Sequence, residues 1–200
     1  MTRLLELQDV TKVFGRGATT NVAVDHLSMV VDEEPPSFTA IAGESGSGKT
    51  TLARMALGLA DPTSGHVLYR GKDLRGLSGT ERREYRRQVQ AVFQDPFEVF
   101  NPFYKVDHLL TTPISLFGLA TSRSDARHQI EQALHTVGLR PEETLGRHPH
   151  QLSGGQRQRL TIARALLLRP RLIIADEPVS MVDASLRATI LESLERLHRD

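Results

Sequence analysis

Cysteine is absent from this chain of 200 residues. That absence excludes a disulfide framework, a thiolate metal site, an iron–sulfur cluster and a cysteine nucleophile, and it agrees with a reducing compartment. An excess of one charge is also lacking, because 25 Lys and Arg residues face 24 Asp and Glu residues and leave a net charge of +1. The protein therefore has no global positive field that would attract nucleic acid.

Long apolar runs are missing too. No segment reaches the ~18 apolar residues of a membrane span, and even the run at residues 165–168 is closed by Arg164 and Arg169. Residues 1–10 carry acidic side chains and no long apolar stretch, so they do not resemble a secretory signal. What is present is a globular composition, with 39% hydrophobic residues in a chain long enough for one domain with a sub-lobe.

The first part of the chain predicts short strands separated by turns, at residues 4–7, 22–31, 37–42 and 67–69. Lys49 begins a predicted helix, since the apolar residues after it recur with helical spacing on one face: Leu52, Met55, Ala56 and Leu59. Ser78 and Glu81 have the spacing of a capping box and predict a charged helix, which an apolar strand at residues 89–93 follows.

The middle of the chain has a different character. Prolines at 96, 102 and 113 predict an irregular stretch, and a helix at residues 125–137 ends at Gly138. A further helix at residues 156–168 precedes an apolar, buried parallel strand at 172–175, and residues 186–197 have helical spacing. We therefore expect a core formed by residues 1–94 and 159–200, with residues 95–158 inserted as a helical subdomain.

Residues 43–50, GESGSGKT, fit the pattern G-x-x-x-x-G-K-S/T between a predicted strand and a predicted helix. Small residues let backbone N–H groups turn towards a polyphosphate, and the start of the following helix adds its dipole. Lys49 would supply a point charge, and the Thr50 hydroxyl would ligate Mg²⁺. A glycine turn that only caps a helix is the structural alternative.

Two carboxylates close the apolar strand in residues 172–178, LIIADEP. The carboxyl ends of strands are where open α/β sheets bind ligands. Asp176 would hold Mg²⁺, and Glu177 would polarise the water that attacks a γ-phosphate. Taken alone, the pair is equally compatible with two solvated acids at a strand end.

A second helix start with the features of an anion site occurs at residues 152–156, LSGGQ. A nucleotide held by the first loop does not require a second such site in the same chain. We therefore expect this helix start to face a nucleotide held by another copy. A plain serine-capped helix is the alternative.

These segments together carry a resemblance to a known family. Residues 43–51, LSGGQRQR at 152–159 and LIIADEP at 172–178 have the order and approximate spacing of ATP-binding cassette (ABC) ATPases, whose signature is LSGGQ. The resemblance extends from about residue 4 to residue 200. QDP at 94–96 with NP at 101–102, and PHQ at 149–151, resemble the ATPase subunits of oligopeptide and dipeptide importers. The resemblance to ABC ATPases implies an α/β fold, with a P-loop NTPase core of mixed sheet and flanking helices and an inserted α-helical subdomain.

The resemblance also assigns roles by position. Phe14 corresponds to the aromatic residue that stacks on adenine, with a core phenylalanine as the alternative, and Gln94 to the glutamine that reaches Mg²⁺ and the attacking water. The implied nucleotide-binding residues are Phe14, Gly43, Ser45, Gly46, Ser47, Gly48, Lys49, Thr50 and Thr51, with Ser153, Gly154, Gly155 and Gln156 of a second copy. The implied metal ligands are Thr50, Gln94 and Asp176, and the implied catalytic residues are Glu177, Lys49 and Gln94.

By the same resemblance, Ser180 and Asp183 anchor the loop that crosses to the partner subunit, although Met181 and Val182 replace the more usual Ala-Leu between them. The family places a histidine that contacts the γ-phosphate after one more core strand. His198 is not that residue, because it belongs to the preceding helix. We therefore expect an incomplete cassette in which ATP binding survives better than turnover.

The function implied is that of an ATP-hydrolysing subunit of an importer for peptides or a similar small solute. Its implied location is cytoplasmic, peripheral on the inner face of the cell membrane. Its implied partners are a second ATPase subunit, identical or related, and transmembrane permease subunits, with a solute-binding protein indirectly. A soluble, non-transport ABC ATPase and a nucleotide-binding module with little turnover remain as alternatives. No nucleic-acid partner is expected, because the arginines at residues 82–87 alternate with Glu81 and Glu84 as on a solvated helix face.

Overall fold

The computed structural model describes residues 2–35, 37–93 and 99–177. The chain divides into two compact units, Met1–Val89 and Gln90–Asp200, which we call the first and the second unit and describe separately. Several positions named in the sequence analysis lie outside the described residues: Gln94, Pro96, Ser180, Met181, Val182, Asp183 and His198. The helix predicted at residues 186–197 also lies outside them.

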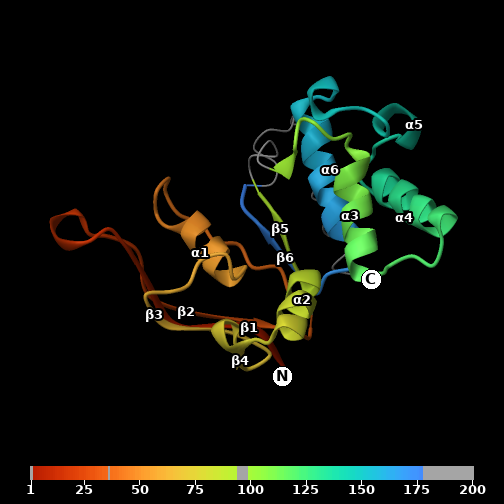
Figure 1. Ribbon diagram of the computed structural model, residues 1–200. Helices are drawn as coiled ribbons and strands as arrows, with labels where there is room; N and C mark the ends of the chain where they lie inside the picture. The colour runs from red at the N-terminus through yellow and green to blue at the C-terminus, as the bar shows by residue number, and fades with distance from the viewer. Residues whose placement is uncertain (1, 36, 94–98, 178–200) are drawn as a thin grey trace. The chain divides into compact units, whose positions relative to one another are not determined.

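An antiparallel sheet forms the base of the first unit (Figure 1). Its strands are β1 (Arg3–Phe14), β2 (Asn21–Asp32), β3 (Ser64–Tyr69) and β4 (Lys72–Asp73), in the order β2-β1-β3-β4. The short 3₁₀ helix η1 (Gly17–Thr19) lies in the turn between β1 and β2. Strand β1 is central because it pairs with both β2 and β3, and its apolar residues Leu5, Leu7 and Val10 are buried.

Helices α1 (Lys49–Ala56) and α2 (Gly79–Gln88) complete the first unit, with η2 (Leu74–Gly76) between β4 and α2. Helix α1 buries Leu52, Met55 and Ala56, as its spacing predicts, but it ends earlier than expected. Gly58 adopts a φ of +65° just beyond the helix, and Leu59 is left 63% exposed. Helix α2 begins with the predicted capping box.

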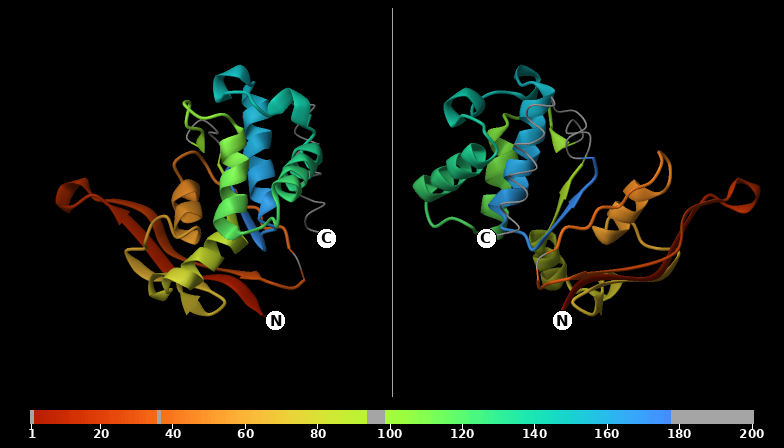
Figure 2. Two further views of the ribbon diagram at one scale, coloured as in Figure 1. Left: turned by 45° about the vertical axis from the view of Figure 1, so that its right-hand side comes forward. Right: turned by 180° about the vertical axis from the view of Figure 1, so that it is seen from behind.

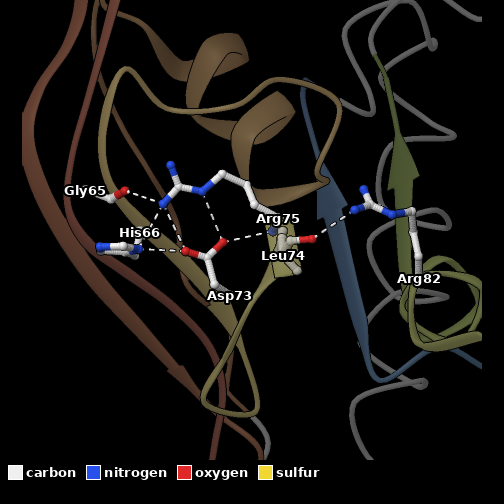
Figure 3. A network of polar contacts seen from close by, with 6 residues as sticks. All are labelled: Gly65, His66, Asp73, Leu74, Arg75 and Arg82. Carbon is white, nitrogen blue, oxygen red and sulfur yellow. Dashed lines mark hydrogen bonds and ion pairs between the residues drawn. The ribbon is translucent and has the colours of Figure 1, made fainter. Parts of the chain in front are cut away.

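A polar network ties β3 and β4 to η2 (Figure 3). Asp73 accepts from the backbone N–H of Arg75 at 2.8 Å and from its Nη2 at 2.9 Å, and lies 2.6 Å from His66 Nδ1. Arg75 Nη2 also donates to the Gly65 carbonyl at 3.1 Å. These donors, with Arg75 foremost, hold the pKa of Asp73 well below its ordinary value.

The second unit combines a two-stranded sheet with a helical bundle. Its elements are β5 (Val89–Val92), α3 (Asp107–Phe117), α4 (Arg123–Thr136), α5 (Pro141–Thr144), η4 (Pro149–Gln151), α6 (Gly154–Leu167) and β6 (Leu172–Ala175). Figure 2 shows α3, α4 and α6 side by side, and one core joins Leu110, Leu134 and Leu160 with Val92 of β5.

Three secondary-structure predictions need correction. Residues 37–42 join neither of the two described sheets, and Phe38 is 77% exposed, since a strand forms only where a partner strand is available. The stretch expected to be irregular contains α3, in which Pro113 is buried. Strand β6 is only half-buried, with Ala175 exposed, because β5 is its one partner among the described strands.

No helix within residues 2–35, 37–93 and 99–177 is long and apolar enough to cross a membrane.

Candidate functional site

The loop at residues 43–48 turns sharply before it enters α1. The backbone N–H of Ser47 donates to the Glu44 carbonyl at 3.2 Å, and Gly46 and Gly48 adopt φ values of +81° and +89°. Left-handed conformations of this kind favour glycine, because a Cβ would clash with the backbone. Gly43, Ser45, Gly46 and Ser47 are exposed, so the loop presents its backbone to solvent.

Gly48 is fixed by a neighbouring strand as well as by its φ. A Cβ placed on Gly48 would lie 2.0 Å from the backbone oxygen of Ala23 in β2, a distance that no side chain can occupy. Gly48 is also the N-cap of α1, and its carbonyl accepts from Leu52 at 2.8 Å. Strand β2 therefore sets where α1 begins, which sequence spacing alone does not show.

Lys49 folds back onto its own loop. Its ammonium donates to the carbonyls of Gly43 and Glu44, both at 2.7 Å, and lies 3.4 Å from the Ser47 hydroxyl. Phosphate oxygens are hydrogen-bond acceptors like these three loop oxygens. The Lys49 ammonium could therefore bind a polyphosphate in their place. Thr50 is exposed and Thr51 is half-buried in the first turn of α1.

Phe14 lies at the end of β1, opposite Asn21 of β2. Its ring is 47% exposed, and Lys12 Nζ lies 5.2 Å from the ring centroid. The exposure contradicts the alternative of a core phenylalanine. Because Asn21 precedes Ala23 on the same strand, Phe14 and the Gly48 end of the loop both lie against the start of β2.

The carboxylates follow β6 in the second unit. Asp176 donates its backbone N–H to the carbonyl of Val92 at 2.9 Å, so the carboxyl ends of β5 and β6 meet. Asp176 is half-buried, and Glu177 is exposed with a φ of +47°. A non-glycine residue in this region is uncommon, and such strain often occurs at functional positions.

The signature helix α6 starts with a complete capping box. The Ser153 hydroxyl accepts from the Gln156 N–H at 3.2 Å, and the Gln156 amide oxygen accepts from the Ser153 N–H at 2.9 Å. Gly154 and Gly155 are half-buried, and a Cβ at either position would meet nothing within 4 Å. The first turn is thus a serine-capped helix with an open approach to its glycines.

The predicted site residues therefore form two groups. Phe14 and residues 43–51 lie in the first unit, and Ser153, Gly154, Gly155, Gln156, Asp176 and Glu177 lie in the second. The hydroxyl of Thr50 and the carboxylate of Asp176 are hard oxygen donors of the kind that Mg²⁺ prefers. No group of three or more His, Asp or Glu side chains suited to a metal occurs among the described residues.

Sequence spacing missed two side chains that brace α6. Gln158 is fully buried and donates from Nε2 to the Phe93 carbonyl at 3.1 Å. Arg159 donates from Nη1 to the Gly138 carbonyl at 2.7 Å and from Nε to the Gly155 carbonyl at 3.3 Å, and burial lowers its pKa. A polar residue at a helix position that the apolar spacing assigns to the core would have identified Gln158.

Comparisons with known proteins agree on the family. A protein-family model described as "ABC transporter" matches residues 26–180. The oligopeptide transport ATP-binding protein OppF of Streptococcus pyogenes serotype M1 is 40% identical over 199 residues, which are 99% of this chain and 64% of that protein. The di/tripeptide transport ATP-binding protein DppF of Pseudomonas aeruginosa strain UCBPP-PA14 is 45% identical over 152 residues, which are 76% of this chain and 46% of that protein.

A solved structure is similar over almost the whole chain. It is the dimeric structure of a post-hydrolysis state of the ATP-binding cassette MJ0796 bound to ADP and Pi, with a TM-score of 0.87, 30% sequence identity and coverage of 98% of this chain and 83% of that one. The likeness confirms the predicted α/β fold class. Against the two transport proteins, the chain spans between 46% and 64% of their length.

Proposed function

Since the chain belongs to the ABC transporter family, we propose that it is the subunit that binds and hydrolyses ATP for an importer of peptides or of a similar small solute. The observation that carries the proposal is the Lys49 ammonium held among three loop oxygens, in a chain 40% identical to an oligopeptide transport ATP-binding protein. The loop offers a phosphate cradle, and the relative supplies the transport context.

Nucleotide binding begins with an exchange of acceptors at Lys49. The β- and γ-phosphate oxygens of ATP replace the carbonyls of Gly43 and Glu44 around the ammonium, while the backbone N–H groups of residues 45–48 turn towards the phosphates. Phe14 stacks on adenine with the ring that β1 leaves exposed. Thr50, Asp176 and Gln94 are the residues that would hold Mg²⁺, which neutralises phosphate charge when bound.

Hydrolysis needs a base beside the γ-phosphate. Glu177 orients and polarises the attacking water, and Lys49 stabilises the charge that develops on the phosphoryl oxygens. The left-handed backbone of Glu177 fixes the direction in which its side chain leaves the strand end.

A second copy, or a related subunit, completes each nucleotide site. Ser153, Gly154, Gly155 and Gln156 start α6 with first-turn N–H groups outside the helical hydrogen-bond ladder, and these favour an anion. The similar solved structure is described as dimeric and bound to ADP and Pi. In this proposal the chain is cytoplasmic and peripheral on the inner face of the cell membrane. Closure of two copies head to tail around ATP would move the attached transmembrane permease subunits, with a solute-binding protein acting indirectly.

Substitution of Lys49 tests the proposed activity. Lys49→Ala should weaken ATP affinity by about tenfold or more, because a charge-assisted contact to phosphate is lost. Lys105→Ala, at an exposed lysine of the second unit, serves as the control and should retain affinity. Equal ATP affinity and equal phosphate release in wild type and Lys49→Ala would refute the role of the loop.

Co-purification tests the transport context. Membranes from cells that express the tagged chain should yield permease subunits whose recovery changes with ATP. Recovery of ribosomal RNA in their place would support the soluble, non-transport ABC ATPase instead.

A further inference from the structure

The exposed ring of Phe14 has a cation over it. Lys12 precedes Phe14 by two residues on β1, and its ammonium lies 5.2 Å from the ring centroid, within the range of a cation–π contact. The ring itself is 47% exposed, so it presents apolar surface that a planar ligand could cover. The cation and such a ligand would then share one aromatic ring.

The Lys12 ammonium is fixed by a second contact. It donates to the backbone carbonyl of Asp61 at 2.7 Å, across 49 residues of sequence. This acceptor is neutral, so it holds the ammonium without cancelling the charge beside the ring. A lysine side chain loses much rotamer freedom when it is held in this way, and the two contacts together give the Lys12 ammonium a defined position.

The Asp61 carbonyl lies just beyond helix α1, whose first residue is Lys49 of the phosphate loop. Two further contacts join the same segment to β1. The Thr63 N–H donates to the Thr11 carbonyl at 2.8 Å, and the Thr63 hydroxyl accepts from the Val13 N–H at 3.0 Å. The strand end that carries the aromatic ring is therefore joined to the chain that leaves the phosphate helix.

Both ends of α1 are thus held against strands of the same sheet. Its N-cap, Gly48, lies against the backbone of Ala23 in β2, and the segment after it is joined to β1. A helix of 8 residues has a fixed length, so these contacts set the separation between the phosphate loop and the Phe14 ring. A nucleotide would span that separation, with its phosphates on the loop and its base on the ring.

We propose that Lys12 is a positioning residue that holds the Phe14 ring where the base of a bound nucleotide stacks. The inference rests on the proposed function, since it matters only if the chain binds a nucleotide through Phe14. The ammonium occupies one face of the ring and leaves the other face to the base. In this role Lys12 acts through the ring, so it affects the base and leaves the contacts of Lys49 with the phosphates unchanged.

The test compares ATP with inorganic tripolyphosphate, which carries the phosphates without a base. Lys12→Met removes the ammonium and keeps an unbranched side chain. In calorimetric titrations, Lys12→Met should weaken ATP affinity about fivefold, the value of a cation–π contact, and should change tripolyphosphate affinity less than about twofold. Equal losses for the two ligands would show that the phosphate loop itself is disturbed and would overturn the inference. An unchanged ATP affinity would overturn it too.

Two further variants are the controls. Lys12→Arg keeps a cation and an N–H donor, and it should bind ATP within about twofold of wild type. Lys72→Met removes another ammonium of the first unit, one that pairs with Glu81 from β4, and it should affect neither ligand. If either control loses as much ATP affinity as Lys12→Met, the inference is wrong.

A double-mutant cycle shows whether Lys12 acts through the ring. Phe14→Ala should weaken ATP affinity about tenfold by itself, because base–aromatic stacking is lost. In the Phe14→Ala background, Lys12→Met should then cause no further loss. A further loss of about fivefold in that background would mean that Lys12 contacts the nucleotide directly, contrary to the inference.

The remaining outcomes are also decisive. If wild type binds neither ATP nor tripolyphosphate, the proposed function fails, and this inference fails with it. If Phe14→Ala binds ATP as tightly as wild type does, the ring has no base to receive and the inference fails while ATP binding stands. If tripolyphosphate binds too weakly to measure, the cycle decides alone. If Lys12→Met does not fold, Lys12→Gln, which removes the charge and keeps an N–H donor, replaces it in both experiments.

Discussion

Gly46 and Gly48 have nearly the same φ but different surroundings. A Cβ on Gly46 would meet nothing within 4 Å, whereas one on Gly48 would lie 2.0 Å from the Ala23 backbone oxygen. A side chain at Gly46 would therefore cost only the strain of a left-handed backbone. A side chain at Gly48 would in addition displace a strand.

Alanine at the two positions should separate these costs. Gly46→Ala is expected to lower the free energy of unfolding by about 1–2 kcal/mol, the cost of a left-handed L-residue. Gly48→Ala should cost about 3 kcal/mol or more, because the backbone of β2 or α1 has to shift as well. Chemical denaturation measures both, and equal losses would show that the approach of Ala23 has no energetic effect.

Asp73 should make stability depend on pH. Its pKa in the folded protein lies below the unfolded value of ~3.9. The stabilisation is therefore fully present above that value and is lost as pH falls through it towards the folded pKa. Asp73→Asn should cost about 1 kcal/mol at neutral pH, after allowance for solvent screening.

The difference between Asp73→Asn and wild type should shrink when thermal unfolding is followed down to pH 3. Asp61→Asn, at an exposed carboxylate of the same unit, is the control and should show a smaller difference at neutral pH. A gap between Asp73→Asn and wild type that widens in acid would contradict the sign of the linkage.

Among the helices, Arg159 joins two elements with one side chain. Its Nη1 donates to the carbonyls of Val137 and Gly138 at 3.4 and 2.7 Å, which closes the C-terminal end of α4 from the side of α6. Helix ends leave carbonyls without intrahelical donors, so this contact replaces a missing part of the hydrogen-bond ladder.

Arg159→Met should reduce the free energy of unfolding of the chain by about 2 kcal/mol, the value of a lost charged hydrogen bond to a partly buried carbonyl. Arg140→Met is the matched control, because within the described part of the chain Arg140 pairs with Glu143 at an exposed helix start, with a side chain that is 71% exposed. The control should change stability by less than about 0.5 kcal/mol. Urea denaturation would decide between them, and equal effects would remove Arg159 from this role.

Elements with strong local signals were predicted well from the sequence. The capping box at Ser78 formed as its spacing indicates, and the apolar face of α1 packs as predicted. The prediction of an irregular stretch around Pro113 was wrong, because Pro113 lies inside α3. There the tertiary packing of the buried proline outweighs its local cost to a helix. The predicted strand at residues 37–42 lacks the long-range pairing that no local pattern can supply.

For the site, motif spacing located the residues and not their contacts. The loop has the left-handed glycines of a tight turn, and the ring of Phe14 is exposed. The serine-capped start of α6 fits both the predicted anion site and the alternative of a plain cap. Three contacts join residues that lie far apart in the sequence. Gln158 donates to the Phe93 carbonyl, Arg159 donates to the Gly138 carbonyl, and the Ala23 backbone oxygen lies against Gly48. Periodicity assigns a residue to a face but does not say which carbonyl it meets.

At the scale of the whole molecule, Ser153 tests whether two copies share a nucleotide. Ser153→Arg should leave ATP affinity of the single chain unchanged while it prevents ATP-dependent dimerisation. The bulky cation would block the approach to Gly154 and Gly155. Size-exclusion chromatography with ATP, in a Glu177→Gln background that slows turnover, measures the dimer.

Ser78→Arg is the control for the lost cap. Ser78 closes the same kind of capping box at α2, so both variants lose a similar stabilisation of about 1 kcal/mol. The Ser78 variant should still dimerise. Loss of ATP binding by the Ser153→Arg monomer, or dimers formed by both variants, would contradict assembly through the signature helix.

The distribution of phenol rings has a practical consequence. The sequence has 3 tyrosines and no tryptophan, and Tyr69 and Tyr85 meet edge to face in the first unit with centroids 5.0 Å apart. The Tyr85 hydroxyl donates to the Ala56 carbonyl at the end of α1, while Tyr104 is the single such chromophore of the second unit. Intrinsic near-ultraviolet emission is therefore weighted towards the unit that carries the phosphate loop, and α1 can be followed optically without any added dye.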